Sequence, residues 1–287
     1  MNIAYFGDDF FIHCFYVLQK FGHNISCVFV CDEDGYGYGN KLLSLAKAKN
    51  IPVFTHKIED GFLDKVIQED KIDLVFSAGY CRKIQFDYAS LPSINIHPTL
   101  LPNGRGPDAA AWVSLKYRND AGVTFHKLSD TFDEGDIVFQ KSVTLMEQDG
   151  WEMYMAKLQI EITGALSVLL ENFPELYSRS VSQGSGSTWP SATVIDRLIK
   201  WEMPHNEIYS IVKAFGRWGA LTFLDDRYLL FNDVELSTYQ HGLPAGKLLN
   251  EDGYAVTIST GEGIALLAKK NILREIDTEE ALNLRLI

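Results

Sequence analysis

Short apolar runs alternate with stretches of helical periodicity through the first hundred residues. Apolar runs of about four to eight residues are typical of strands buried on both faces, and apolar residues three or four apart indicate amphipathic helices. Their alternation predicts βα units around a mostly parallel sheet with helices on both faces. The predicted strands are MNIAYF, ISCVFVCD, IPVFTH, IDLVFSAGY and SINIHP, and the helices between them are FFIHCFYVLQKFGH, GNKLLSLAKAKN and FLDKVIQEDK.

Two more strands and a long helix complete this α/β, Rossmann-like domain. The strands are predicted at AGVTFHKLS and DIVFQKSVTL. After Gly150 a helix is predicted, because apolar residues spaced by three or four form one stripe. The stripe consists of Met155, Leu158, Ile162, Leu166 and Leu169. We expect all five side chains to be core.

The composition changes at YSRSVSQGSGSTWPS, where serine and glycine replace apolar residues, as in a linker. Beyond Pro190 the pattern predicts a helix at HNEIYSIVKAFG and five short strands in GALTFLDDRYLLFNDVEL, AGKLLNE, YAVTIST and GIALLAKKN. Short strands separated by Asp, Asn and Gly turns favour a small β-barrel or curled sheet. We therefore expect an α/β domain over residues 1–180, a linker over 181–192 and a small β-rich, OB-like domain over 193–287.

The charge is acidic along the whole chain. Its 26 Lys+Arg and 38 Asp+Glu give a net charge of -12. Up to Trp189 there are 16 basic against 24 acidic residues, and after it 10 against 14. A polyanion is held largely by cationic contacts to phosphate, so neither part favours a nucleic-acid partner. A small anionic ligand in a locally basic pocket stays open.

Cysteine spacing and the N-terminus indicate the cellular setting. Cys14, Cys27, Cys31 and Cys81 show no paired spacing, so neither a disulfide framework nor a zinc knuckle is expected. This usage fits a reducing cytoplasm. The start MNIAYFGDDF lacks the features of a signal peptide, and no run of about 18 apolar residues predicts a membrane span. We expect a cytoplasmic protein without a membrane partner.

Two acidic turns, FGDDFF and CDEDGYGYGN, are candidate ligand sites by their composition. In FGDDFF one glycine precedes two acids, which disfavour a phosphate, so we expect a capped helix start in which Asp8 or Asp9 accepts backbone N–H bonds. CDEDGYGYGN lacks the spacing of a calcium loop, and no metal is predicted there. That segment is expected to be a mobile surface loop in which Tyr36 or Tyr38 packs on a substrate.

Asn95 and His97 interrupt the apolar run INIHP directly before Pro98. Residues i and i+2 of a strand point to one face, so the two polar side chains lie together while their Ile neighbours pack opposite. A lone histidine in such a run is usually a hydrogen-bonded core residue. An asparagine beside it at the end of a strand, before a Gly/Pro loop, is equally well explained by a functional site.

A second group of polar residues lies in SDTFDEGDIVFQ, where Asp130, Asp133, Glu134 and Asp136 surround Gly135. These residues fit an acidic turn whose aspartates bond their own backbone. They also fit a carboxylate placed against His97, where it would raise the basicity of the imidazole and fix its orientation. The pattern leaves both interpretations open.

NIHPTLLPNGRG and FDEGDIVFQ together resemble the 10-formyltetrahydrofolate-dependent formyltransferases, whose motifs come in this order. The resemblance covers residues 1–175, and WEMPHNEIYSIVKAFGRWGAL resembles the start of the C-terminal barrel of methionyl-tRNA formyltransferase and some relatives. It implies a catalytic trio of Asn95, His97 and Asp133. Asn95 and protonated His97 would donate to the oxyanion, and Asp133 would orient His97 and help remove the amine proton. It implies N10-formyltetrahydrofolate as co-substrate and no metal.

SAGYCRKI resembles the family's folate-binding segment, which holds the pteridine largely through backbone groups. The implied folate residues are Ala78, Tyr80, Cys81, Arg82, Lys83 and Ile84, together with Asp130 in the second folate loop.

The resemblance to the family does not identify the acceptor amine, which must be inferred from the features in which this chain agrees with or departs from each group of the family. The acidity, size and C-terminal module resemble the sugar N-formyltransferases, which formylate a nucleotide-linked amino-deoxysugar and would place the chain in lipopolysaccharide or other glycan biosynthesis. Methionyl-tRNA, and an amino acid or hydroxylamine of secondary metabolism, remain alternatives. A glycinamide ribonucleotide acceptor is disfavoured because GDDFF replaces that group's Gly/Ser-rich turn.

In the sugar interpretation, PNGRGPDAAAW is the substrate loop. Phe10 would pack on the substrate, and Asn103, Gly104 and Arg105 would contact it. Arg105 would pair with the pyrophosphate; the alternative is a structural arginine that bonds loop carbonyls. Two other functions remain as alternatives. One is an inactive ligand-binding relative whose C-terminal domain forms a homodimer. The other is an NAD(P)-dependent oxidoreductase, which is disfavoured because this sequence lacks the Gly-rich turn of such enzymes.

Overall fold

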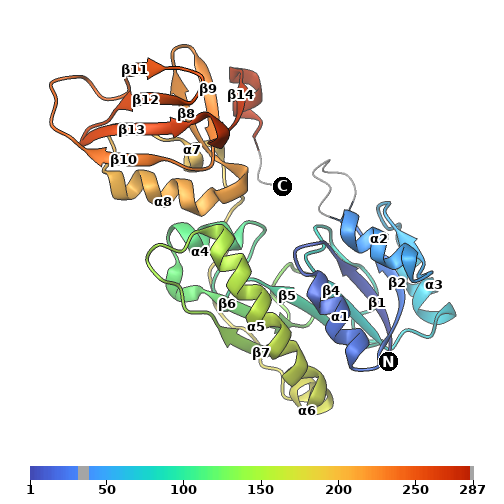
Figure 1. The fold of residues 1–287 in the computed structure, drawn as a ribbon. Helices are drawn as coiled ribbons and strands as arrows, with labels where there is room; N and C mark the ends of the chain where they lie inside the picture. Colours follow the sequence, from blue (N-terminus) through green and yellow to red (C-terminus); the bar gives the residue numbers. More distant parts are fainter. Residues whose placement is uncertain (32–38, 285–287) are drawn as a thin grey trace. The chain divides into compact units, whose positions relative to one another are not determined.

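The computed structural model describes residues 1–31 and 39–284. Its α/β part contains a seven-stranded sheet of order β3-β2-β1-β4-β5-β6-β7 (Figure 1). The strands are β1 (Asn2–Gly7), β2 (Asn24–Phe29), β3 (Val53–Phe54), β4 (Leu74–Ala78), β5 (Ser93–His97), β6 (Gly122–His126) and β7 (Ile137–Ser142). The first five run parallel, whereas β6 and β7 pair antiparallel. The mostly parallel, Rossmann-like sheet predicted from the sequence is confirmed.

Helices cover both faces of the sheet, because alternate strand residues carry apolar side chains to each side. The helices along this part of the sequence are α1 (Ile12–Lys20), α2 (Asn40–Ala48), α3 (Phe62–Glu69), α4 (Ala109–Leu115), α5 (Trp151–Glu171) and α6 (Phe173–Ser178), with a 3₁₀ turn at Arg118–Asp120; of these, α4 apart from Ala109 belongs to the second compact unit described below. On β1, Ala4 and Phe6 share a buried cluster with Leu63 of α3. Tyr5 between them instead meets Phe15 of α1, with ring centroids 5.6 Å apart.

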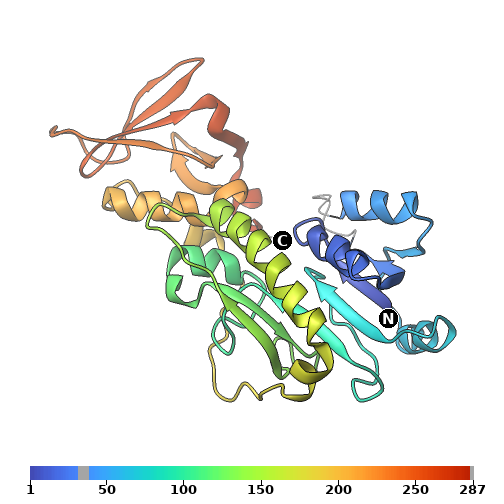
Figure 2. The same cartoon turned by 60° about the horizontal axis from the view of Figure 1, so that its bottom comes forward.

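The long helix α5 lies across β6 and β7 in both views (Figures 1 and 2). All five residues of its predicted apolar stripe are buried, which confirms that they are core. By length and composition alone α5 also passes as a membrane span, against the expectation from the sequence. The burial of its stripe is what the core helix of a globular domain shows.

The C-terminal part contains two small antiparallel sheets, of order β10-β13-β12-β11 and β14-β9-β8. Its elements are α7 (Val194–Arg197), α8 (His205–Phe215), β8 (Ala220–Leu224), β9 (Arg227–Phe231), β10 (Glu235–Thr238), β11 (Leu248–Glu251), β12 (Ala255–Ser259), β13 (Gly263–Ala268), β14 (Ile272–Ile276) and α9 (Thr278–Leu282), with 3₁₀ turns at Gly216–Trp218 and Lys269–Asn271. One core joins α8 and both sheets through Val212, Phe231 and Ile258. The small antiparallel β-rich part is confirmed, but the five predicted strands are two fewer than the seven in the described residues, because neither β10 nor β14 had a predicted strand of its own.

The chain forms two compact units. The first consists of Met1–Ala109, Asp120–Thr144 and Ala156–Trp189, and the second of Ala110–Asn119, Leu145–Met155 and Pro190–Ile287. Most of the predicted linker thus belongs to the α/β unit. The domain boundaries predicted at residues 180 and 193 stay a prediction.

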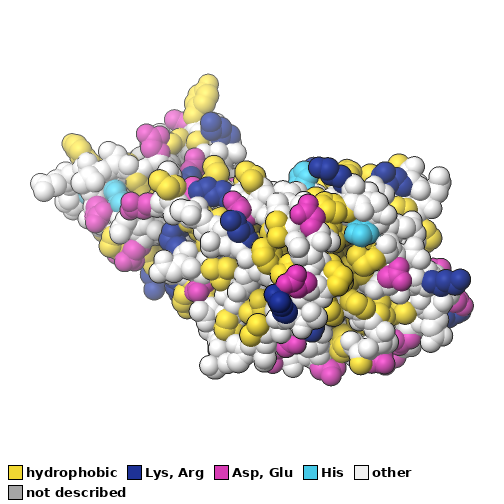
Figure 3. Space-filling view, turned by 90° about the horizontal axis from the view of Figure 1, so that it is seen from below, with side chains coloured by type: hydrophobic (Ala, Val, Ile, Leu, Met, Phe, Trp, Pro, Cys, Tyr) yellow, Lys and Arg dark blue, Asp and Glu magenta, His cyan; other side chains and the backbone are white. Residues whose placement is uncertain are grey.

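Five basic side chains of the second unit are paired with carboxylates. The pairs are Lys213–Asp233, Arg217–Glu152, Arg227–Glu251, Lys269–Glu251 and Arg274–Glu280. On the molecular face of Figure 3, lysine and arginine side chains are scattered among acidic ones and do not gather in one patch. Pairing and scattering of this kind give little net positive field for a polyanion.

Cys31 and Cys81 form a disulfide, so the expectation of four unpaired cysteines is wrong. Cys31 follows β2 and Cys81 follows β4, and both strands flank β1. The carboxyl ends of parallel strands meet at one edge of a sheet, which brings together two cysteines 50 residues apart. Cys14 and Cys27 are free and buried. The predicted cytoplasmic location stays a prediction.

Thiol titration tests this disulfide. In guanidinium without reductant, a thiol reagent is expected to find two groups, Cys14 and Cys27, and four after reduction. The native protein should react slowly, because burial above all raises the pKa of both thiols, with the charge of Asp8 adding at Cys14 and that of Asp70 at Cys27. The Cys81→Ser variant should show three groups without reductant. Four groups in unreduced wild type would contradict the pairing.

Candidate active site

The first βα turn carries two aspartates that accept hydrogen bonds from backbone N–H groups. Asp8 accepts hydrogen bonds from the backbone N–H groups of Phe10 and Phe11, just before α1. Asp9 accepts from Lys41 and Leu42 in the first turn of α2, at 3.0 and 2.8 Å. The prediction that Asp8 or Asp9 accepts backbone N–H bonds is confirmed, but α1 has Phe11 as its N-cap and no side-chain cap hydrogen bond. Phe10 lies half-buried in this turn, and its contact with a substrate stays a prediction.

The pairing of β5 sets the position of Asn95 and His97. On one side β4 places Ser77 next to Asn95 and Ala78 next to Ile96. On the other side β6 places His126 opposite Asn95. The predicted folate segment therefore leaves the sheet beside the end of β5, and a second histidine faces the Asn95–His97 pair from β6.

His97 lies between a backbone carbonyl and a carboxylate. Its Nε2 is 2.7 Å from the Gly104 carbonyl oxygen, and its Nδ1 is 3.4 Å from Oδ1 of Asp133. A carbonyl oxygen can only accept, so Nε2 carries a proton and Nδ1 is the nitrogen that titrates. The 3.4 Å separation is longer than a well-formed hydrogen bond, which leaves the Nδ1 edge able to serve another acceptor. Asp133 is thus brought to His97 as predicted.

The loop that carries Asp133 is tightly specified. Asp133 adopts φ 58°, in the left-handed region that non-glycine residues seldom occupy. Its Oδ2 accepts the backbone N–H of Gly106 at 3.0 Å. Gly135 closes the loop where a Cβ would lie 1.9 Å from the Lys127 carbonyl oxygen, so no other residue fits there. For Asp133 the carboxylate interpretation of this motif therefore holds, since its side chain bonds the Gly106 backbone and lies against His97.

Charge coupling favours the ion-pair form of His97 and Asp133. Burial, the largest single influence, lowers the pKa of His97, but the charge and hydrogen bond of Asp133 and the Gly104 carbonyl together raise it above its ordinary value. Burial likewise acts to raise the pKa of Asp133. The charge and hydrogen bond of His97, then His126 and the Gly106 N–H, outweigh it and hold the Asp133 pKa well below its usual range.

His126 is a site residue that sequence reasoning missed. Its Nδ1 donates to the Lys127 carbonyl at 2.8 Å, which leaves Nε2 to accept from Asn95 Nδ2 at 3.0 Å. Burial above all, together with the charge of His97, lowers the pKa of His126 to about 4 against the opposing effects of Asp133 and the Lys127 carbonyl, so the ring is neutral near pH 7. The neutral ring fixes the Asn95 amide with its NH₂ group inward. One N–H of Asn95 remains for a ligand.

The predicted substrate loop makes mostly internal contacts. Arg105 is buried and donates to the Gln183 side chain, the Gly184 carbonyl and the Glu134 carboxylate. These contacts are the ones expected if Arg105 is a structural residue. The pairing of Arg105 with a pyrophosphate stays a prediction. Asn103 is exposed and donates to Asp120, while the Gly104 backbone N–H donates to Ser187.

The predicted folate segment divides between core and surface. Ala78 and Ile84 are buried, and half-buried Tyr80 meets the ring of Phe6 at 5.1 Å. Cys81 is in the disulfide, Arg82 is half-buried, and Lys83 lies 3.9 Å from the Asp130 carboxylate. Asp130 is thus brought to the segment, although it is not brought to the catalytic trio by any contact.

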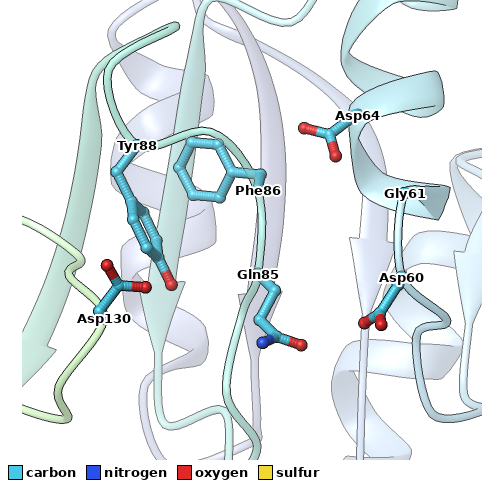
Figure 4. A pocket seen from close by; sticks show the side chains of 7 residues that line it. All are labelled: Asp60, Gly61, Asp64, Gln85, Phe86, Tyr88 and Asp130. Carbon is cyan, nitrogen blue, oxygen red and sulfur yellow. The ribbon is translucent and has the colours of Figure 1, made fainter.

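A pocket of about 300 Å³ lies beside this segment (Figure 4). It is lined by Asp60, Gly61, Asp64, Gln85, Phe86, Tyr88 and Asp130. Tyr88 and Asp130 lie side by side at one end, and Gln85 and Asp60 point the same way (Figure 4). Of the predicted folate residues only Asp130 is among these seven. Three carboxylates and two rings suit a flat, hydrogen-bond-donating group better than an anion.

Two further features predicted from the sequence concern metal binding and the segment that contains Tyr36 and Tyr38. Within residues 1–31 and 39–284, no group of three or more His, Cys, Asp or Glu side chains is placed to hold a metal ion. Tyr36 and Tyr38, expected to pack on a substrate, lie outside the described residues.

Both parts of the chain match family models. Residues 23–168 match the model described as "Formyl transferase", and residues 193–282 match "Formyl transferase, C-terminal domain". A methionyl-tRNA formyltransferase of Pelotomaculum thermopropionicum is 25% identical over 276 residues, which cover 92% of this chain and 88% of that protein.

Solved structures share the fold. HypX of Aquifex aeolicus in complex with tetrahydrofolic acid aligns with 99% of this chain and 47% of its own, at a TM-score of 0.71 and 19% identity. An N-formyltransferase of Helicobacter canadensis, in complex with folinic acid and dTDP-3-aminofucose, aligns with 93% of this chain and 98% of its own, at a TM-score of 0.62 and 18% identity.

Proposed function

Because the chain belongs to the formyl transferase family, we propose that it transfers the formyl group of N10-formyltetrahydrofolate to the amine of a nucleotide-linked amino-deoxysugar. The observation that best supports this proposal is the His97–Asp133 ion pair, which lies with the oriented Asn95 amide at the end of β5. Folate-dependent formyl transfer is the family's reaction, and the sugar acceptor is the proposed part.

The trio suits acyl transfer between two nitrogens. The acceptor nitrogen bonds to the formyl carbon, the bond from that carbon to N10 breaks, and the proton lost by the amine passes to N10. The free N–H of Asn95 and the Nδ1–H of protonated His97 would stabilise negative charge on the formyl oxygen. Asp133 would orient His97, keep it protonated and accept the amine proton, directly or through water.

The folate residues proposed are Ala78, Tyr80, Cys81, Arg82, Lys83, Ile84 and Asp130. Residue Ala78 ends β4 next to Ile96, so a ligand held by the following backbone would lie beside Asn95 and His97. The proximity of donor and acceptor would then contribute much of the rate. No metal enters the proposal.

The acceptor is proposed from charge. The second unit has more acids than bases, and its Lys213, Arg217, Arg227, Lys269 and Arg274 are paired with carboxylates. A tRNA partner would need such cations free for phosphate contacts. A nucleotide-linked sugar needs only a local site. The Helicobacter canadensis N-formyltransferase, which shares the fold, was solved in complex with such a molecule, dTDP-3-aminofucose.

Methionyl-tRNA is the second candidate acceptor. It is favoured by the curated relatives, which match this chain through both domains and are named methionyl-tRNA formyltransferases. The acidic second unit weighs against it.

An acceptor assay separates the two. Purified protein with N10-formyltetrahydrofolate is given dTDP- and UDP-linked amino-deoxysugars, free amino sugars, or methionyl-tRNA, and tetrahydrofolate release is measured. We expect turnover with a nucleotide-linked amino sugar, and its binding should raise the melting temperature. The His97→Ala variant is the blank for the chemical step. Turnover with methionyl-tRNA alone would refute the sugar acceptor, and folate-independent formylation would refute the proposed donor.

A further inference from the structure

Gln183 lies in the segment that sequence reasoning took for a linker, yet its side chain is buried between two loops of the site. Its Nε2 donates to the backbone carbonyls of Asp133 and Gly135, both at 2.7 Å. Its Oε1 accepts the Nε–H of Arg105 at 3.0 Å. Two donors and one acceptor leave only one orientation of the amide, because the reversed amide would place oxygen against two carbonyls.

The backbone that Gln183 holds needs support. Asp133 has φ 58°, a conformation that costs free energy for a residue with a Cβ and persists only when its surroundings fix it. The Asp133 carboxylate is held by the Gly106 N–H, and its carbonyl by Gln183. Without the Gln183 contacts, residues 133–135 could relax to an ordinary turn, and the carboxylate would leave His97.

Gln183 also joins this loop to the Arg105 loop. Arg105 Nη1 lies 3.3 Å from Glu134, and Arg105 Nη2 donates to the Gly184 carbonyl at 3.1 Å. The same loop supplies the Gly104 carbonyl that holds His97 Nε2 and the Gly106 N–H that holds Asp133. One buried amide thus contacts both segments that fix the His97–Asp133 geometry.

We propose that Gln183 is a positioning residue, which holds the Asp133 carboxylate against His97 by fixing the backbone of residues 133–135 to the Arg105 loop. The inference deepens the proposed function and rests on it for the catalytic meaning of the pair. The geometric part does not depend on the acceptor. It can therefore be measured in the protein without substrate.

The variants Gln183→Ala and Gln183→Glu test the proposal. Glu keeps the shape and the acceptor for Arg105 but loses both donors, so it serves where the alanine variant folds poorly. Both are expected to lower kcat by roughly 10- to 100-fold, the cost of a misplacement of about 1 Å, with little change in KM for the formyl donor. The alkaline limb of the kcat–pH profile should move to lower pH, because His97 loses the nearby carboxylate.

The substrate-free measurement is a ¹³C-histidine NMR titration, with the His97 signal assigned by its absence in His97→Ala. Both Gln183 variants should titrate His97 at lower pH than wild type. Gln159→Ala on α5, a half-buried glutamine outside the site, is the matched control and should leave kcat and the His97 titration unchanged. An unchanged His97 titration in the Gln183 variants overturns the inference even where kcat falls. If no acceptor is formylated by wild type, the proposed function fails while the titration still decides on Gln183.

Discussion

The His97→Ala variant is expected to transfer formyl groups roughly 10²–10⁴-fold more slowly than the unmodified chain, with little change in KM for the formyl donor. His97, the last residue of β5, has Nδ1 as its titrating nitrogen, and this nitrogen faces the Asp133 carboxylate. Removing the ring takes away a donor to the developing oxyanion, so the loss falls on the transition state. Steady-state kinetics of tetrahydrofolate release measure both constants.

An exposed histidine provides the matched control. His56→Ala lies beyond β3, outside the site, and should retain wild-type kcat. Circular dichroism and the melting temperature of both variants separate chemistry from folding. A His97→Ala rate within threefold of wild type would remove His97 from the catalytic trio.

The Asp133→Asn variant should lose activity to a similar extent and change its pH dependence. In wild type, Asp133 stays ionised well below its ordinary pKa, and His97 stays protonated above its own. Without the carboxylate, burial remains the main influence and lowers the His97 pKa. The alkaline limb of kcat should therefore move to lower pH, as measured between pH 5 and 9. Asp136→Asn, whose side chain pairs with Lys127, should leave the limb in place.

The same substitution should change stability in a defined pH window. Because the pKa of Asp133 is depressed in the folded protein, this group stabilises the native state above its ordinary pKa of about 4. That stabilisation is lost as the pH falls through the pKa that Asp133 has in the folded protein. Because the pKa of His97 is raised, this group stabilises the native state below its ordinary pKa of about 6.5, and that stabilisation is lost as the pH rises through its folded-state pKa. The melting temperature of wild type should exceed that of Asp133→Asn most between about pH 4 and 6.5. A difference that does not vary with pH would show that the ion pair contributes nothing.

Sequence reasoning reached the elements whose signal is local. The period of two placed Asn95 and His97 on one face, and the step of three or four placed the buried stripe of α5. It missed His126, although that histidine lies within a predicted strand. Its role depends on the antiparallel register that sets it opposite Asn95, and no local pattern encodes that register.

The other omissions have a similar cause. Cys31 and Cys81 meet only because β2 and β4 flank β1, which is a property of strand order. Gln183 stands in a Ser/Gly-rich segment whose composition indicates a linker, and nothing in composition tells where such a segment runs. The internal partners of Arg105, which are Gln183, Gly184 and Glu134, likewise come from segments distant in the sequence, so its structural contacts have no local signal.

The hydrogen bonds of Asp8 and Asp9 limit how this scaffold could be re-engineered. In dinucleotide-binding α/β proteins the first turn is a glycine-rich cradle for the cofactor. Here, replacing Asp9 would remove the acceptor of two N–H groups at the start of α2, and a lost cap costs about 1 kcal/mol. Replacing Asp8 would remove the acceptor of the Phe10 and Phe11 N–H groups in the turn before α1. A designer seeking to install redox chemistry at this edge would first have to redesign this turn and the start of α2.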